Sequence, residues 1–209
     1  MNILVIDSSK KRACIQIITA ERTVSYTLDE TEKHSENLLK RIDELLTRQD
    51  LKLADIDTYC AVVGPGSFTG IRVGLSTIKA FNTVFNKKLI SINAFEPFLS
   101  TARNGVILLS STHTSFYYAI VKNGAIEKMD VVSIDDIKDL VKGKKVYMLD
   151  FEKYAELKDF DINYIDNYNK LLENVVITKQ NRGEFVADNK FEPLYIQLSQ
   201  AELQLKNKK

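Results

Sequence analysis

The residues best suited to chemistry form one glycine-rich block, Gly64-Pro65-Gly66-Ser67-Phe68-Thr69-Gly70-Ile71-Arg72-Val73-Gly74. It follows an apolar run at 56–63 and precedes an apolar segment that reaches residue 85, which predicts a turn between a strand and a helix. Ser67 and Thr69 can cap that helix, whose first amides would favour an anion. The block is no Walker motif, because Ile and Arg follow Gly70 where Lys and Ser or Thr are required, and its spacing does not fit the dinucleotide fingerprint. An ordinary structural turn explains the same residues.

Gly64 and Gly66 lie on either side of Pro65, which fixes φ, whereas glycine can take positive φ, so we expect a tight reversal here. The helix predicted over 70–85 carries two apolar faces. The first face is Ile71, Leu75, Ile78 and Phe85, and the second is Val73, Thr77, Ala80 and Val84. Only the stripe of Arg72, Ser76, Lys79 and Thr83 is polar. A helix of this kind must be buried on more than one side, so either the chain itself or a partner covers it.

The composition describes a globular protein of one or two lobes. The chain has 209 residues, 44% hydrophobic and 27% charged, with a net charge of +1. So small a charge offers no general attraction for nucleic acid, and any RNA contact must be local. Cys14 and Cys60 lie among apolar neighbours without metal-like spacing, which predicts buried free thiols in a reducing cytosol. We expect a cytoplasmic protein, since neither a signal peptide nor an apolar run of about 18 residues is present.

The elements that must position the block follow a βββαβαβ order. Strands are expected at 2–7, 12–19, 22–28, 56–63 and 89–92, and helices at 34–49 and 70–85. The helix at 34–49 has an apolar side made of Leu38, Leu39, Ile42, Leu45 and Leu46. A short helix capped by Asn93 ends this half, and the break at Asn104-Gly105 predicts a first lobe over 1–103.

The second half, 104–209, repeats the plan in reduced form. Strands are expected at 106–110, 116–122, 125–132, 145–149 and 162–165, with a tight hairpin at Asn123-Gly124. Helices are expected from a cap at Ser133 to Gly143, over 168–177 and over 194–205. One possible arrangement returns the last of these helices to the first lobe. The repetition predicts a duplicated α/β fold with two lobes.

Two βββαβα lobes with an aspartate at the end of the first strand resemble the actin-like superfamily, which includes sugar kinases and the Hsp70 ATPase and is abbreviated ASKHA. Within it the chain resembles the TsaB (YeaZ) family of bacterial tRNA threonylcarbamoyladenosine biosynthesis proteins. The matching residues are Ile6-Asp7-Ser8-Ser9, His34-Ser35-Glu36-Asn37-Leu38, the glycine block and Pro193-Leu194-Tyr195. The similarity covers roughly residues 1–100. The family's second lobe usually starts with an Asp-Ala-Arg-like sequence, where this chain has Ser110-Ser111-Thr112-His113.

The resemblance implies a non-catalytic subunit that is required for N6-threonylcarbamoyladenosine at position 37 of tRNAs reading ANN codons. Such a subunit pairs with a TsaD-like transferase, a TsaE-like ATPase completes the complex, and tRNA is contacted only indirectly. The implied pairing surface comes from the two helices of the first lobe, and the same surface would form a homodimer when the chain is alone. Its expected residues are His34, Leu38, Leu39, Ile42, Leu46, Ile71, Arg72, Leu75, Ile78 and Lys79. Arg72 would either hold its helix against the preceding strand or pair with a carboxylate of the partner.

The alternative is a stand-alone actin-like ATPase or small-molecule kinase. Its phosphate clamp would use Asp7-Ser8-Ser9, but the second turn, 110–114, has no Asp or Gly, and no glycine lies between Gly143 and Gly183 for an adenosine turn. Asp7 either orients the water shell of Mg²⁺, as in an active relative, or hydrogen-bonds its own turn. We expect no metal site, because His34 has no second histidine at helical spacing. No cofactor is expected either, although a structural nucleotide at a partner interface stays open.

Overall fold

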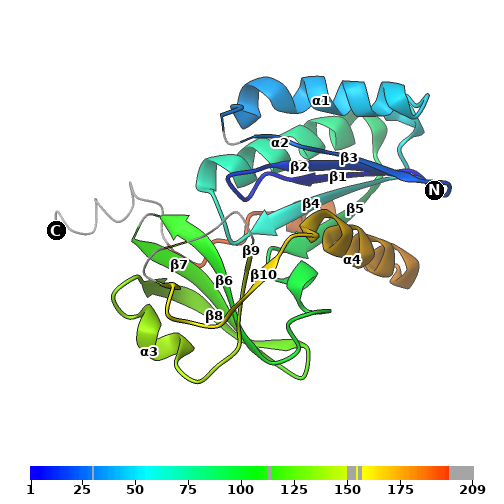
Figure 1. Cartoon of the computed structure of the whole chain (residues 1–209). Coiled ribbons are helices and arrows are strands. Elements are labelled where there is room, and N and C mark those ends of the chain that lie inside the picture. Colours follow the sequence, from blue (N-terminus) through cyan, green and yellow to red (C-terminus); the bar gives the residue numbers. More distant parts are fainter. Residues whose placement is uncertain (30, 113, 150–153, 155–156, 198–209) are drawn as a thin grey trace. The chain divides into compact units, whose positions relative to one another are not determined.

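The computed structural model describes residues 1–29, 31–112, 114–149, 154 and 157–197 (Figure 1). The chain divides into two compact units, each with its own five-stranded sheet. The first unit comprises Met1–Glu96 and Asn169–Leu194, and the second comprises Pro97–Tyr168 with the described residues that follow Leu194. The first unit therefore ends before the expected boundary at 103, and the segment that returns to it is 169–194.

The first sheet has the strand order β3-β2-β1-β4-β5. Its strands are β1 (Ile3–Asp7), β2 (Cys14–Ile18), β3 (Thr23–Thr27), β4 (Thr58–Gly64) and β5 (Lys88–Asn93). β1, β4 and β5 run parallel, whereas β2 pairs antiparallel with both β1 and β3. Every residue of β1, β2 and β4 is buried, as expected for strands that are covered on both faces.

Helices cover both faces of this sheet. α1 (His34–Arg48) and α2 (Phe68–Phe85) lie on one face, and α4 (Tyr168–Arg182) lies on the other (Figure 1). The main core lies between the first two helices and alternate strand residues such as Leu4, Ile6 and Tyr59. On the opposite face the Gln16 side-chain amide donates to the Asn169 carbonyl of α4 at 2.7 Å. Alternate side chains of β2 therefore meet different helical layers, which is why the whole strand is buried.

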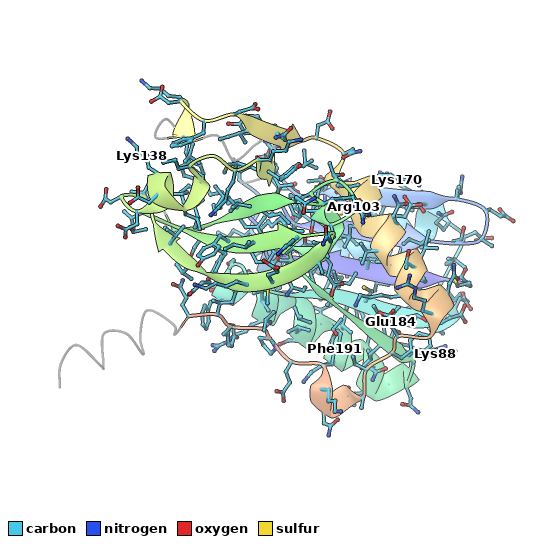
Figure 2. All side chains as sticks on the ribbon, turned by 90° about the horizontal axis from the view of Figure 1, so that it is seen from below. Lys88, Arg103, Lys138, Lys170, Glu184 and Phe191 are labelled. Carbon is cyan, nitrogen blue, oxygen red and sulfur yellow. The ribbon has the colours of Figure 1, made fainter. Side chains whose placement is uncertain are left out.

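The segment 184–194 after α4, here called the strap, lies along the edge of the first sheet. Its Val186 N–H donates to the Leu89 carbonyl at 2.9 Å, and its Leu194 N–H donates to the Val63 carbonyl at 2.8 Å. Figure 2 labels Lys88 of β5 together with Glu184 and Phe191 of the strap. Phe191 is completely buried in the core of the first unit. The strap thereby covers the edge of β5, which would otherwise be open to pairing with another chain.

The second sheet repeats the first in order and strand sense, β8-β7-β6-β9-β10. Its elements are β6 (Gly105–Thr112), β7 (Ser115–Lys122), β8 (Ala125–Ser133), α3 (Ile137–Val141), β9 (Val146–Leu149) and β10 (Ile162–Ile165). β6, β9 and β10 run parallel, and β7 pairs antiparallel with β6 and β8. The predicted duplication is therefore confirmed strand by strand.

Local signals in the sequence also have their expected structures. Asn123 and Gly124 both have positive φ in the hairpin between β7 and β8. The Ser133 hydroxyl accepts the Asp136 N–H at 3.1 Å, and the Asn93 side chain accepts the Phe95 N–H at 3.0 Å. The helix expected from 194 does not begin there, because Leu194 belongs to the strap, and the remainder of that expectation, 198–205, lies outside the described residues.

Candidate functional site

The turn that follows β1, Asp7–Lys10, packs directly against the glycine block. The Ser67 N–H donates to the Ser9 carbonyl at 2.7 Å, and the Ser8 hydroxyl donates to the Gly70 carbonyl at 2.7 Å. These two motifs are about 60 residues apart in the sequence, and they meet because β1 and β4 are parallel neighbours whose ends lie at the same edge of the sheet. The structure therefore brings the predicted phosphate turn and the predicted motif turn into one site.

The close approach explains three of the glycines in the block. A Cβ at Gly66 would overlap the Ser9 carbonyl, and a Cβ at Gly70 would overlap the Ser8 carbonyl. Gly74 likewise leaves space for the Ser8 hydroxyl. Gly66 does not have positive φ, so glycine is needed at this position for the close contact rather than for its backbone conformation.

Gly64 does have positive φ, 119°, and the bond to Pro65 is cis. A Cβ at Gly64 would overlap the carbonyl of Leu194 on the strap. Together with the bond from Leu194 to Val63, this contact gives the Pro193-Leu194-Tyr195 motif a structural partner in the glycine block. Ser67 is the N-cap of α2 and accepts the Gly70 N–H at 3.2 Å, whereas Thr69 lies inside the helix as an exposed residue.

Asp7 is neutralised by a lysine from its own turn. Its Oδ1 accepts the Ser9 N–H at 3.0 Å and also accepts the Ser9 hydroxyl. Its Oδ2 lies 2.7 Å from Nζ of Lys10, and only 1% of the Asp7 side chain and 4% of the Lys10 side chain are exposed. A buried carboxylate needs such a partner, since an unpaired charge in the interior is strongly destabilising. The interpretation in which Asp7 hydrogen-bonds its own turn is confirmed, and the role of Lys10 was missed because lysine is normally a surface residue.

The hydroxyl-rich turn of the second unit has a different character. The Thr112 hydroxyl lies 2.8 Å from the Ser115 hydroxyl and accepts the Thr114 N–H at 3.2 Å. Gln197 donates to the Ser111 hydroxyl at 2.9 Å and to the Tyr117 hydroxyl at 3.1 Å. His113, in the same stretch, lies outside the described residues. The hydroxyl groups of this turn therefore bond to one another and to the described end of the chain.

Most of the residues expected on the pairing surface lie in the core instead. Six of them, all apolar, are between 0% and 5% exposed and belong to the core of the first unit, namely Leu38, Ile42, Leu46, Ile71, Leu75 and Ile78. The expectation that a partner protein covers these side chains is wrong, because the sheet and the neighbouring helix already cover them. The second apolar face of α2 is only partly covered, since Val73 and Thr77 are half-buried and Ala80 and Val84 are exposed.

The other members of that predicted surface are more accessible. Leu39 is 59% exposed, Arg72 is exposed and Lys79 is half-buried, while the side chain of His34 is outside the described part of the chain. The Arg72 guanidinium lies 5.6 Å from the centroid of the Phe68 ring on the same helix. Val84, which belongs to the second apolar face of α2 and was not among the residues expected on the pairing surface, is 73% exposed. Leu39, Arg72, Ala80 and Val84 define what we call the helix surface.

An ion-pair cluster fixes α1 to the preceding turn. Arg41 lies 2.8 Å from Glu32 and 2.9 Å from Glu44, and its guanidinium lies 4.3 Å from the centroid of the Tyr26 ring. Hydrogen bonds from Arg41 are the main reason that the pKa values of Glu32 and Glu44 are lowered. The cluster holds the start of α1 and is structural in character.

The two cysteines are free and buried, as predicted, and burial raises the pKa of both thiols. Within the described ranges, no three His, Cys, Asp or Glu side chains lie close enough together to hold a metal ion. The same ranges contain no helix with the length and apolar character needed to cross a membrane.

Comparison with solved structures identifies the fold. YeaZ from Pseudomonas aeruginosa superimposes with a TM-score of 0.72 over 93% of this chain and 99% of that chain, at 15% sequence identity. The duplicated βββαβ plan and this likeness define an actin-like fold. In this chain the turn after β1 is filled by its own side chains.

Comparison of the sequence is consistent with that class. The family model for TsaD, tRNA N6-adenosine threonylcarbamoyltransferase, matches residues 28–177. The TsaB protein of Bacillus subtilis, a tRNA threonylcarbamoyladenosine biosynthesis protein, is 22% identical over 192 residues, which are 86% of this chain and 78% of that protein. The chain belongs to the TsaD family of actin-like proteins and, within it, to the TsaB (YeaZ) family.

The catalytic members of the family are much longer. The transferase of Kosmotoga olearia is 31% identical over 109 residues, which are 44% of this chain and 33% of the transferase. That of Rhizobium etli strain CFN 42 is 39% identical over 89 residues, which are 24% of its length. The chain thus spans a third or less of these transferases.

Proposed function

We propose that this chain acts in the formation of N6-threonylcarbamoyladenosine in tRNA as a non-catalytic subunit that pairs with a TsaD-type transferase. The observation that carries the proposal is the combination of membership in the family with a turn after β1 whose side chains bond to one another and to the glycine block. Asp7 binds Lys10, the Ser9 N–H and hydroxyl bind Asp7, and the Ser8 hydroxyl binds the glycine block. A chain that keeps the fold while the side chains of this turn are already bonded is suited to supporting a catalytic relative.

The accessible helix surface is the proposed site of pairing. It presents two large exposed apolar side chains, Leu39 and Val84, and the cation Arg72. Interfaces typically combine apolar anchors with arginine. A homodimer of the isolated chain would use the same surface, and a TsaE-like ATPase would complete the complex. In this proposal the chain contacts tRNA only indirectly, needs no resident cofactor and works in the cytoplasm.

The test is co-purification and size-exclusion chromatography with the TsaD-type protein of the same organism. We expect wild type to form a stable complex and Leu39→Glu to weaken it at least about tenfold, since a charge replaces an apolar contact. Tyr164→Glu is the matched control, because Tyr164 is 41% exposed on β10 of the second unit, whereas the residues of the helix surface belong to the first unit. It should pair as wild type does. Absence of a complex with wild-type protein, or normal pairing by folded Leu39→Glu, would refute the pairing surface.

Leu75, which the sequence placed on the pairing surface, cannot be used to test pairing. It is 3% exposed in the core, so Leu75→Glu would bury an unpaired carboxylate and unfold the first unit. Circular dichroism of the variant should reveal lost structure before any binding experiment. A well-folded Leu75→Glu would contradict the placement of α2 against the sheet.

A further inference from the structure

The actin-like fold implies a site for Mg²⁺ and nucleotide at the turn after β1, and the residues present do not fit that site. A divalent cation requires oxygen ligands with free lone pairs and negative charge. The only carboxylate of the Asp7–Lys10 turn is already bound to an ammonium group at 2.7 Å, and its other oxygen accepts from Ser9. Lys10 Nζ also lies 3.2 Å from the Ser9 hydroxyl, so it occupies the space between two oxygens that could hold a cation.

The phosphate side of the turn is equally occupied. The Ser8 hydroxyl donates to the Gly70 carbonyl at 2.7 Å, and the Ser9 N–H donates to Asp7 at 3.0 Å. The glycine block holds the turn in this state, because it contacts the Ser8 and Ser9 carbonyls without room for a Cβ atom. An incoming phosphate would therefore have to break these hydrogen bonds before it could bind to the turn.

We propose that Lys10 is a built-in counter-cation that takes the place of the divalent cation at Asp7, so that the turn is folded and neutral without metal or nucleotide. The ammonium supplies one positive charge and three donors, and it uses them on Asp7 and Ser9. The inference does not rest on the proposed role in tRNA modification, since it concerns only the charge balance of this turn. It has one specific consequence: removal of the lysine side chain should leave an anionic site that a divalent cation can fill.

The experiment is thermal unfolding of the full chain in EDTA and in increasing MgCl₂ or MnCl₂, with and without ATP. Wild type and the matched control Lys11→Ala, which alters an exposed lysine next to the turn, should show no shift in Tm. Lys10→Ala should be less stable in EDTA and should gain about 3–5 °C for each tenfold rise of the divalent cation above its dissociation constant. The gain should vanish in Asp7→Asn/Lys10→Ala, which lacks the carboxylate.

Two results would overturn the proposal. One is a rise in the Tm of wild type with Mg²⁺ or with Mg²⁺ and ATP that disappears in Asp7→Asn, because it would show a working site. The other is a Lys10→Ala protein that divalent cations do not stabilise. If Lys10→Ala is unfolded in EDTA, refolding on addition of Mn²⁺ is the expected result, and failure to refold counts against the proposal. Binding of Mn²⁺ to folded wild type, measured by electron paramagnetic resonance, decides the same question without any variant.

Discussion

Gly70→Ala sets helix propensity against packing in a single substitution. Gly70 lies in the first turn of α2, where alanine is favoured over glycine by about 1 kcal/mol. Its missing side chain, however, faces the Ser8 carbonyl, and a Cβ atom there would lie far inside the contact limit of 3.0 Å. The obstructing atom belongs to the backbone at the end of a fully buried strand, so it cannot rotate away. Relief therefore requires α2 and the turn after β1 to separate.

Separation would weaken the two hydrogen bonds that join these elements, Ser8 to Gly70 and Ser67 to Ser9, both 2.7 Å long. Each weakened bond with a buried partner costs about 1–3 kcal/mol, and overpacking adds about 1–3 kcal/mol. After subtraction of the gain in propensity, we expect Gly70→Ala to lower the free energy of unfolding by about 2–8 kcal/mol, with a central value of about 5 kcal/mol.

The assay is urea unfolding followed by circular dichroism. Gly183→Ala is the matched control in the same unit, because Gly183 has φ of 68° and only a distant contact, 3.9 Å from Phe185. It should lose only about 1–2 kcal/mol, from the left-handed backbone. A Gly70→Ala protein that is more stable than wild type, or less affected than the control, would refute the argument that the turn and the helix are in contact.

Three further predictions concern the core and its charges. Tyr59→Phe should keep or raise the free energy of unfolding by up to about 1 kcal/mol, because the buried Tyr59 hydroxyl has no hydrogen-bond partner among the described residues. Tyr26→Phe, which removes a bond to Glu32 at 3.3 Å, should instead lower stability slightly, and equal effects of the two variants in urea would contradict this. Because the pKa values of Glu32 and Glu44 are lowered in the folded state, their ion pairs stabilise the protein above the unfolded pKa, and this stability is lost as the pH falls below about 5. Arg41→Met should therefore make the decrease of Tm in acid less steep. An unchanged profile of Tm against pH would contradict the role of the cluster. Both cysteines should react with a thiol reagent only after unfolding, since both are buried and have raised pKa values, and rapid labelling of native protein would oppose that placement.

Much of the fold could be predicted from the sequence because its signals are local. The Asn123-Gly124 hairpin and the cap at Ser133 each depend on residues within one turn. The two-lobed repeat followed from the order of these elements. The glycine block was correctly placed between a strand and a helix, with Ser67 as the cap.

The candidate site was predicted less completely, since its contacts join distant parts of the chain. Periodicity identified the apolar face of α2 but could not say whether the chain's own sheet or a partner covers it, and the structure assigns Leu75 to the core. It also grouped Leu39 with the buried residues of α1, although Leu39 is exposed. The return of α4 and the strap was not expected, because a helix pattern does not specify which sheet it will cover.

The sequence by itself determined the order of elements, the duplication, the buried thiols and the family motifs, because these depend on residue type and spacing along the chain. Only the tertiary structure decided what each motif contacts. The sequence gives no sign that Lys10 is buried, and only the fold places it beside Asp7. Gly66 and Gly70 are needed because they face backbone carbonyls of the turn after β1, and Gly74 is needed because it faces the Ser8 side chain. The reason is physical: burial and charge balance are properties of neighbours in space, and parallel strands bring together residues that the sequence keeps far apart.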